Sequence, residues 1–222
     1  MTTMFPDDPW SGIRAAGREI AEGFLAATDR IDHLLAEAAR FGERGWPLNP
    51  DWDSAELASL VDAFGEAEFN DVFVAFYECE NGARISHAFA DIATRDTMER
   101  WRPIIQQSEQ ALDRGQHALI VPALLTVLEG RVFANSTNTT SVRQEVKRTM
   151  EAQGNGFSRM VWQTILDFVN ALFAHSDFEA VEPHFNRHWI LHGRASAGWE
   201  RADVIRLLHG IHTIDQALTD PA

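Results

Sequence analysis

One short stretch of the chain holds the residue types best suited to chemistry on a phosphate group. Arg187, His188 and His192 fall within about two helical turns of one another. An arginine guanidinium binds a phosphate through a planar fork of hydrogen-bond donors, and a histidine imidazole transfers protons near neutral pH. RNA cleavage by the RNA's own 2′-hydroxyl group needs both properties, because the hydroxyl must lose a proton and the phosphate gains charge.

Helix geometry governs how these side chains meet. Arg187 and His192 are five residues apart, so an α-helix separates them by about 140° around its axis and about 7.5 Å along it. They converge only at a groove, more easily when a second subunit contributes its own pair. His188 and His192 share a face. In the predicted mechanism one of the histidines takes the proton of the 2′-hydroxyl and Arg187 stabilises the phosphate. The products are a cyclic phosphate and a 5′-hydroxyl, and no cofactor is required.

A purely structural role and a metal site are the alternatives for these residues. In the structural role, Arg187 pairs with a carboxylate and His192 caps the helix before Gly193, both for stability alone. In the metal site, a zinc ion is bound by His184, His188 and His192, which recur every four residues. One straight helix face supplies at most two good ligands, and the chain lacks the Glu-x-x-His pairs of di-iron bundles. We therefore expect no metal at this site.

Composition predicts an ordinary globular protein. The chain has 222 residues, of which 45% are hydrophobic and 23% charged, enough for one large domain or two small ones. Cys79 is the only cysteine, which excludes an internal disulfide and a Cys-x-x-Cys metal site. The N-terminus shows no signal-like apolar run, and the most apolar stretch, 118–128, is too short to span a bilayer. We expect a cytoplasmic protein without a membrane partner.

The charge distribution restricts where RNA can bind. A net charge of −14 argues against general binding to nucleic acid. Residues 184–212, however, hold four arginines against two acids, together with five of the nine histidines. The sequence therefore predicts one local RNA site in this window rather than a broad basic face, and the acidic remainder makes binding there selective or weak.

Apolar residues recur with helical spacing along most of the chain, whereas the alternation typical of strands is scarce. We predict an all-α protein, with an N-terminal helical region at 1–97 and a helical bundle domain at 98–222. A loop rich in glycine and proline covers 41–54, Pro183 begins the helix of the motif, and Gly193 ends it. The predicted helices cover residues 14–40, 54–64, 67–79, 83–95, 103–114, 117–133, 142–151, 159–175, 183–193 and 203–218.

Segments along the chain resemble, in order, a bacterial family whose C-terminal half is HEPN-like (higher eukaryotes and prokaryotes nucleotide-binding). Gly45-Trp46 resembles the N-terminal region of that family. The resemblance is strongest at Trp-Arg-Pro-Ile-Ile at 101–105, Gly-Gln-His-Ala-Leu at 115–119, Leu-Leu-Thr-Val-Leu-Glu-Gly at 124–130 and Asn-Arg-His-Trp-Ile-Leu-His-Gly at 186–193. HEPN proteins are often ribonucleases of toxin–antitoxin or phage-defence systems, and some keep the fold without the activity. The resemblance implies a HEPN-like helical bundle with an N-terminal helical extension.

The resemblance also implies roles for individual residues. Arg187 and His192 correspond to the catalytic pair of the family, and His188 occupies the polar position after the arginine. Many members dimerise so that two motifs face each other. Glu129, at the end of an apolar helix, either pairs with Arg187 and orients it, as the resemblance favours, or is an exposed residue of the last helical turn. Around this pair, supporting roles fall to Asn186, which opens the motif, and to Arg194, which adds a phosphate contact or is an ordinary surface residue.

Two functions from different classes follow. One is a metal-independent endoribonuclease that acts as a homodimer on RNA, with an antitoxin or defence-system protein as partner. The alternative is a non-catalytic interaction or regulatory module that binds a protein or a nucleotide, which the acidity of the chain suits. Most of the seven tryptophans are expected in the core or at interfaces, and Trp189, inside the motif, is the candidate for stacking on a base.

Overall fold

The structure is a computed structural model. It describes residues 36–37, 39–52, 54–63, 69–134, 141–153, 157–174, 179, 183, 185–196 and 198–219. The chain divides into two units, Met1–Glu37 and Ala38–Ala222, and the second holds every element discussed below. Most of the predicted helix 14–40 and His184 lie outside the described residues.

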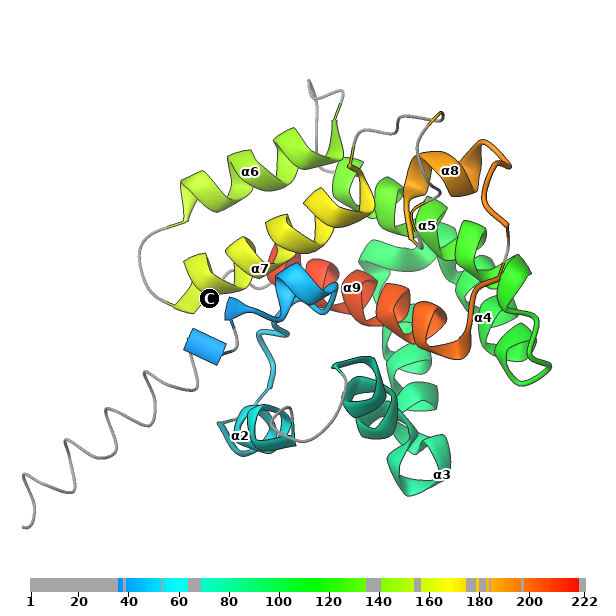
Figure 1. Ribbon diagram of the computed structural model, residues 1–222, viewed down its shortest axis with the longest axis horizontal. Coiled ribbons are helices and arrows are strands. Elements are labelled where there is room, and N and C mark those ends of the chain that lie inside the picture. The colour runs from blue at the N-terminus through cyan, green and yellow to red at the C-terminus, as the bar shows by residue number, and fades with distance from the viewer. Residues whose placement is uncertain are drawn as a thin grey trace, which may run out of the picture. The chain divides into compact units, whose positions relative to one another are not determined.

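The prediction of an all-α protein is confirmed, and the described residues contain no strand (Figure 1). The predicted bounds 117–133 coincide with helix α5, and the other predicted helices that lie among the described residues also appear. The elements are η1 (Gly42–Arg44), α2 (Ser54–Ala63), α3 (Phe69–Thr94), η2 (Asp96–Trp101), α4 (Arg102–Leu112), α5 (His117–Phe133), α6 (Val142–Ala152), α7 (Phe157–Leu172), α8 (Arg187–Leu191) and α9 (Arg201–Thr219).

Helix α3 is two helices joined at a sharp corner. Cys79 has an extended backbone, and the next three residues, Glu80, Asn81 and Gly82, have positive φ angles. The two halves match the predicted helices 67–79 and 83–95. The unit begins well before the predicted boundary at residues 97 and 98, because α3 packs against both α4 and α9.

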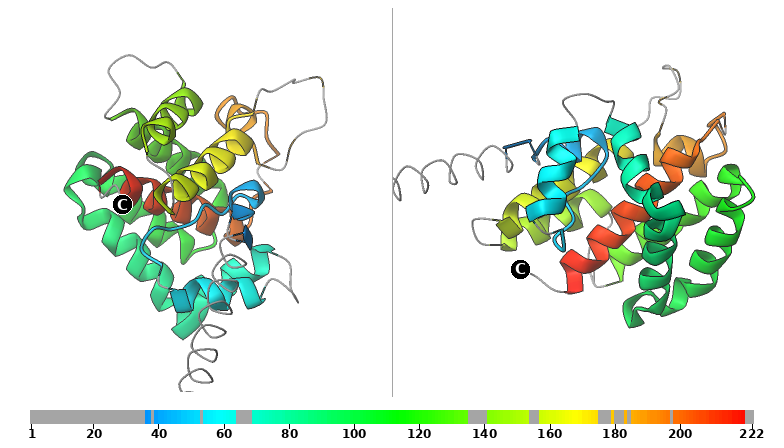
Figure 2. Two further views of the ribbon diagram at one scale, coloured as in Figure 1. Left: turned by 90° about the vertical axis from the view of Figure 1, so that its left-hand side faces the viewer. Right: turned by 90° about the horizontal axis from the view of Figure 1, so that it is seen from below.

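Helix α9 is the centre of the bundle. It packs against α3, α5 and α7, and the views in Figure 2 show it running among them. Every residue from Asp203 to Ala217 is buried except His212, which is partly exposed. A helix that is buried all round must pair its polar side chains inside the protein. None of the helices described combines the length and apolar character needed to cross a membrane.

His209 is one polar side chain of α9 that is fully paired inside the protein. Its Nε2 lies 2.6 Å from the carbonyl oxygen of Pro47, and its Nδ1 lies 2.7 Å from the hydroxyl of Tyr77. A carbonyl only accepts, so Nε2 carries the proton and Nδ1 accepts from Tyr77. The ring is fully buried, and this burial lowers the pKa of His209 to about 3. The imidazole is therefore a neutral bridge between α3, α9 and the segment around Pro47.

We expect this histidine to make the fold sensitive to acid. As the pH falls below about 6.5, the unfolded chain protonates His209, but the folded chain does not until about pH 3. The free energy of unfolding therefore decreases through this window, by about 3 kcal/mol at pH 4 from this residue alone. Urea unfolding at pH 7 and pH 4 measures the loss. His209→Gln should flatten the pH dependence, whereas the exposed control His87→Gln should not. Equal slopes in the wild type and His209→Gln would contradict the prediction.

Candidate functional site

The predicted motif lies at α8, and Asn186 determines where this helix begins. Asn186 is buried and has an extended backbone, and its side-chain oxygen accepts hydrogen bonds from the backbone N–H groups of His188 (2.9 Å) and Trp189 (3.4 Å). Its amide nitrogen donates to the carbonyl oxygen of Ala174, just beyond α7. Asn186 thus caps α8 and ties it to the bundle. The prediction that the helix begins at Pro183 is wrong, because this cap starts it four residues later.

Gly193 ends α8 as predicted. It has a φ of +66°, the left-handed conformation that favours glycine. His192 is the C-cap residue, and its backbone N–H bonds to the carbonyl of His188. Its side chain is exposed. The chain then turns back, so that the backbone N–H of Arg194 bonds to the carbonyl of Trp189 at 2.9 Å.

The predicted pairing of Glu129 with Arg187 is confirmed. Arg187 Nη2 lies 2.9 Å from each oxygen of Glu129, and Nε lies 3.2 Å from Oε2. The pair joins α5 to α8 and remains accessible, with the side chains of Arg187 and Glu129 23% and 27% exposed. These bonds fix the direction of one edge of the planar guanidinium, the edge formed by Nε and Nη2. No residue in the described ranges accepts a hydrogen bond from Nη1, so this end of the guanidinium can meet a phosphate oxygen.

Packing around Gly130 holds Glu129 in place on α5. A Cβ at Gly130 would lie 2.5 Å from the indole of Trp101, so glycine is needed for this close approach. The helix on either side of Glu129 is anchored by the fully buried Leu128 and by Arg131, which is 2% exposed. Glu129 therefore holds Arg187 from a rigid part of the fold. A site that orients a substrate needs this kind of rigid support.

His188 and His192 stack on one another. Their ring centroids are 6.2 Å apart, and the planes differ by 8°. His188 is half-buried and His192 exposed. The predicted shared face of the two histidines is thus confirmed, with two imidazoles side by side on the short helix whose first residue is Arg187.

The rest of the predicted RNA-binding window does not join this site. His209 and His212 lie in interior networks, and His212 Nε2 is 2.7 Å from Asp91. Arg201 pairs with Glu78 on α3. Arg206 is 8% exposed and bonds to Asn70 at 2.6 Å. His209, His212 and Arg206 do not reach the motif, because α9 turns most of its faces into the core. Of the four arginines in the window, Arg187 and Arg194 lie at the motif, since Arg201 is turned to Glu78 and Arg206 is buried.

Trp189 does not suit a role in base stacking. Its side chain is 9% exposed, and Ile190 beside it is 6% exposed. Both anchor α8 to the bundle, because apolar side chains of this size gain most when they are removed from water. The prediction that Trp189 stacks on a base is therefore wrong.

His212 and Asp91 form a polar contact that the sequence did not indicate. Burial lowers the pKa of His212, and the hydrogen bond to Asp91 opposes this shift only in part. Burial raises the pKa of Asp91, but the hydrogen bonds from His212 and Arg95 outweigh it, so its pKa falls below the ordinary value. Because Nε2 of neutral His212 donates to Asp91, Nδ1 is left to accept from Asn49, 3.4 Å away. No local spacing could reveal contacts between residues about 120 positions apart.

The described residues hold no group of three or more His, Cys, Asp or Glu side chains placed to bind a metal ion. Comparison of the chain with family models, with curated proteins and with solved structures finds no match. The function must therefore be inferred from the residues of α5 and α8 themselves.

Proposed function

We propose that this protein is a metal-independent endoribonuclease of the HEPN type, with Arg187 and His192 as its catalytic residues. The observation that carries the proposal is the clamp of Glu129 on Arg187 next to the stacked histidines. A carboxylate holds one end of the guanidinium and leaves Nη1 for a phosphate. The imidazoles on the same short helix supply the proton chemistry.

The reaction needs no group beyond these side chains. His192 removes the proton of the 2′-hydroxyl, and the 2′-oxygen forms a bond to the adjacent phosphorus. Arg187 stabilises the added negative charge on the phosphoryl oxygens. The bond from phosphorus to the 5′-oxygen then breaks, and that oxygen takes a proton, which we assign to His188. The products are a 2′,3′-cyclic phosphate and a 5′-hydroxyl.

The neighbouring residues support this role. Asn186 fixes the start of α8 and therefore the direction of Arg187. Arg194 is exposed just after the turn that ends α8, and it provides a second cation for the RNA backbone. Leu191 lies between Arg187 and His192 in the motif, and its side chain is 36% exposed. An exposed leucine at this position suits a homodimer in which two motifs face each other. We place this ribonuclease in a toxin–antitoxin or phage-defence setting, with a protein partner that controls it.

Cleavage of end-labelled transfer RNA in EDTA tests the proposal. The wild-type chain should cut the RNA and leave a cyclic phosphate, since the attacking group is the 2′-hydroxyl. A matched RNA with a single 2′-deoxy substitution at the cut position should resist cleavage there. Loss of activity in EDTA, or cleavage of the deoxy-substituted bond, would contradict the mechanism.

The interaction module remains the second candidate, because one observation favours it. Leu119, at the start of α5, is 67% exposed, which is unusual for a large apolar side chain beside a groove between α4 and α5. A protein partner could cover it. If purified wild-type chain cleaves no RNA, and Leu119→Ser loses a partner that the wild type retains, the interaction module replaces the ribonuclease.

A further inference from the structure

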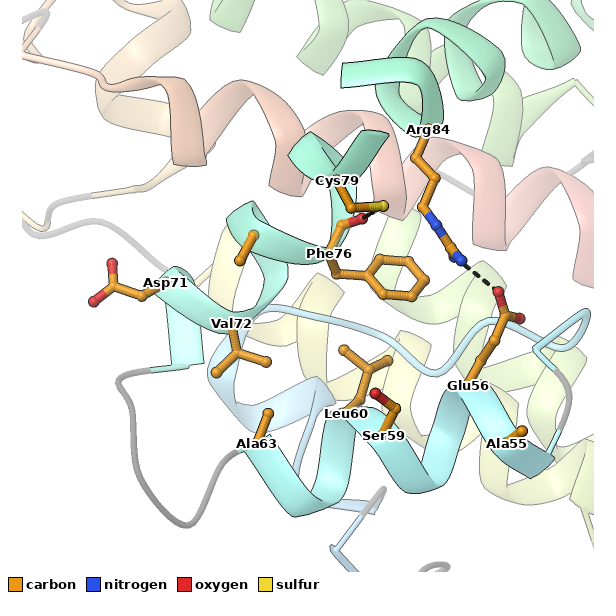
Figure 3. A pocket seen from close by; sticks show the side chains of 11 residues that line it. Ala55, Glu56, Ser59, Leu60, Ala63, Asp71, Val72, Phe76, Cys79 and Arg84 are labelled. Atoms are coloured by element: carbon orange, nitrogen blue, oxygen red, sulfur yellow. Dashed lines mark hydrogen bonds and ion pairs between the residues drawn. The ribbon is translucent and has the colours of Figure 1, made fainter. Parts of the chain in front are cut away.

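A second site lies between α2 and the first half of α3, at residues that the proposed ribonuclease does not use. These helices border a cavity of about 850 Å³, which is within the range of small-molecule sites (Figure 3). Its walls are mostly apolar. Figure 3 shows Leu60 of α2 and Val72 and Phe76 of α3 bordering this space, with the small side chains Ala63 and Ala75 also in the lining.

One end of the cavity is polar. Arg84 donates from Nη1 to Glu56 Oε1 at 2.7 Å, and its guanidinium carbon lies 4.1 Å from the centre of the Phe76 ring. The Arg84 side chain is 38% exposed. The same Arg84 and Glu56 also line an adjoining polar cleft of about 320 Å³ that includes Asp91 and His212. A ligand in the apolar cavity would therefore reach a hydrated, polar region at this end.

The corner inside α3 creates this arrangement. Phe76 and Arg84 are eight residues apart, and a continuous helix would separate them by about 12 Å along its axis. The extended Cys79 and the left-handed residues Glu80 and Asn81 turn the chain instead, so that the guanidinium lies over the ring. Left-handed conformations in residues other than glycine cost free energy and cluster at functional sites.

The polar end of the cavity has unused hydrogen-bond donors. Arg84 has five N–H donors, and its hydrogen-bond partners in the described structure are Glu56 and the thiol of Cys79, a weak acceptor. The carboxylate of Asp71, at the opposite end, points away from the cavity (Figure 3). The unused donors of Arg84 therefore match an anion, and the planar guanidinium matches a carboxylate in particular.

We propose that this cavity binds a small carboxylic acid with an apolar aliphatic or aromatic body. The carboxylate binds Arg84, and the body packs against Phe76, Leu60 and Val72. Glu56 competes with the ligand for Arg84 and repels its carboxylate. A site for cationic amines would select a ligand of the opposite charge. A matched anion and cation therefore distinguish the two kinds of site.

Calorimetric titration of the full chain with decanoate, and with decylamine as the matched cation, tests the proposal. Decanoate should bind saturably at one site, and decylamine should not. Arg84→Gln should weaken decanoate binding about tenfold or more, because a charge-assisted hydrogen bond is lost. Ala75→Trp should abolish binding by filling the cavity, since Ala75 is exposed to it. Glu56→Gln should tighten binding about threefold by removing the competing carboxylate.

Matched controls come from residues outside the cavity lining. Arg100 also lies over an aromatic ring, at 5.1 Å from Trp101, and Ala90 is exposed on α3, so Arg100→Gln and Ala90→Trp should bind like the wild type. Circular dichroism confirms folding. If Arg84→Gln does not fold, Glu56→Gln and Ala75→Trp decide the question. The proposal is overturned if decanoate does not saturate the wild type, if decylamine binds instead, or if Glu56→Gln weakens binding.

Discussion

Replacing His192 by alanine is expected to reduce RNA cleavage by about a hundredfold or more, the usual contribution of a general base. Arg187→Ala should cause a loss of about the same size, because a donor to the developing phosphate charge is removed. His192 is exposed after the end of α8, so its loss should leave the fold intact. Glu129, left without its arginine, is 27% exposed and stays hydrated. Initial rates on one end-labelled RNA, at equal protein concentration, measure both effects.

Two matched variants separate chemistry from general damage. His87→Ala removes an exposed histidine of α3, and Arg100→Ala removes an exposed arginine of η2. Both should cleave at the wild-type rate. Arg187→Lys should recover little activity, since an ammonium cannot hold Glu129 and a phosphate as a fork does. If His192→Ala and Arg187→Ala both cleave as fast as the wild type, the assignment of the active site is wrong.

The candidate site was predictable where its determinants are local. Gly193 ends α8 where the sequence predicted, by its left-handed backbone, whereas the Asn186 cap places the start of the helix after the predicted Pro183. The spacing of four residues placed His188 and His192 on one face. The pairing of Glu129 with Arg187 links residues 58 positions apart, and it was expected from the family resemblance rather than from spacing.

The parts that were not predictable depend on long-range packing. Arg206 and His209 are close to the motif in sequence, yet α9 is enclosed by its neighbours and carries both inward. A periodic pattern shows one buried face of a helix, but α9 buries nearly every face, so polar residues in it cannot be assigned to the surface in advance. The cavity beside α2 has the same origin, because Glu56 and Arg84 meet only through the corner in α3.

A polar network centred on the buried Asp215 also depends on long-range packing, and we expect it to contribute strongly to stability. Asp215 of α9 is fully buried and pairs with Arg131 of α5, which is 2% exposed. It also accepts hydrogen bonds from Thr97 at 2.8 Å and from Arg95 at 3.2 Å. The network ties α5, α9 and η2 together near the C-terminal ends of both helices. Each of its charges is tolerated inside the protein because the others compensate it.

We expect Asp215→Ala to lower the free energy of unfolding by about 3–5 kcal/mol, a large share of the total for a typical domain. Arg95 keeps Asp91 as a partner, but Arg131 is left charged and buried without a carboxylate. Urea unfolding followed by circular dichroism at pH 7 measures the loss. Asp96→Ala, which removes an exposed carboxylate near the same network, should change stability by about 0.5 kcal/mol at most.

The double variant Arg131→Met with Asp215→Leu determines where the cost resides. If the cost of Asp215→Ala is that of an uncompensated buried charge, removing both charges should recover most of the lost stability, since apolar side chains of similar volume often replace a buried ion pair at no cost. A double variant no more stable than Asp215→Ala would instead assign the loss to the hydrogen bonds from Thr97 and Arg95. A loss below about 1 kcal/mol in Asp215→Ala itself would contradict the central role of this network.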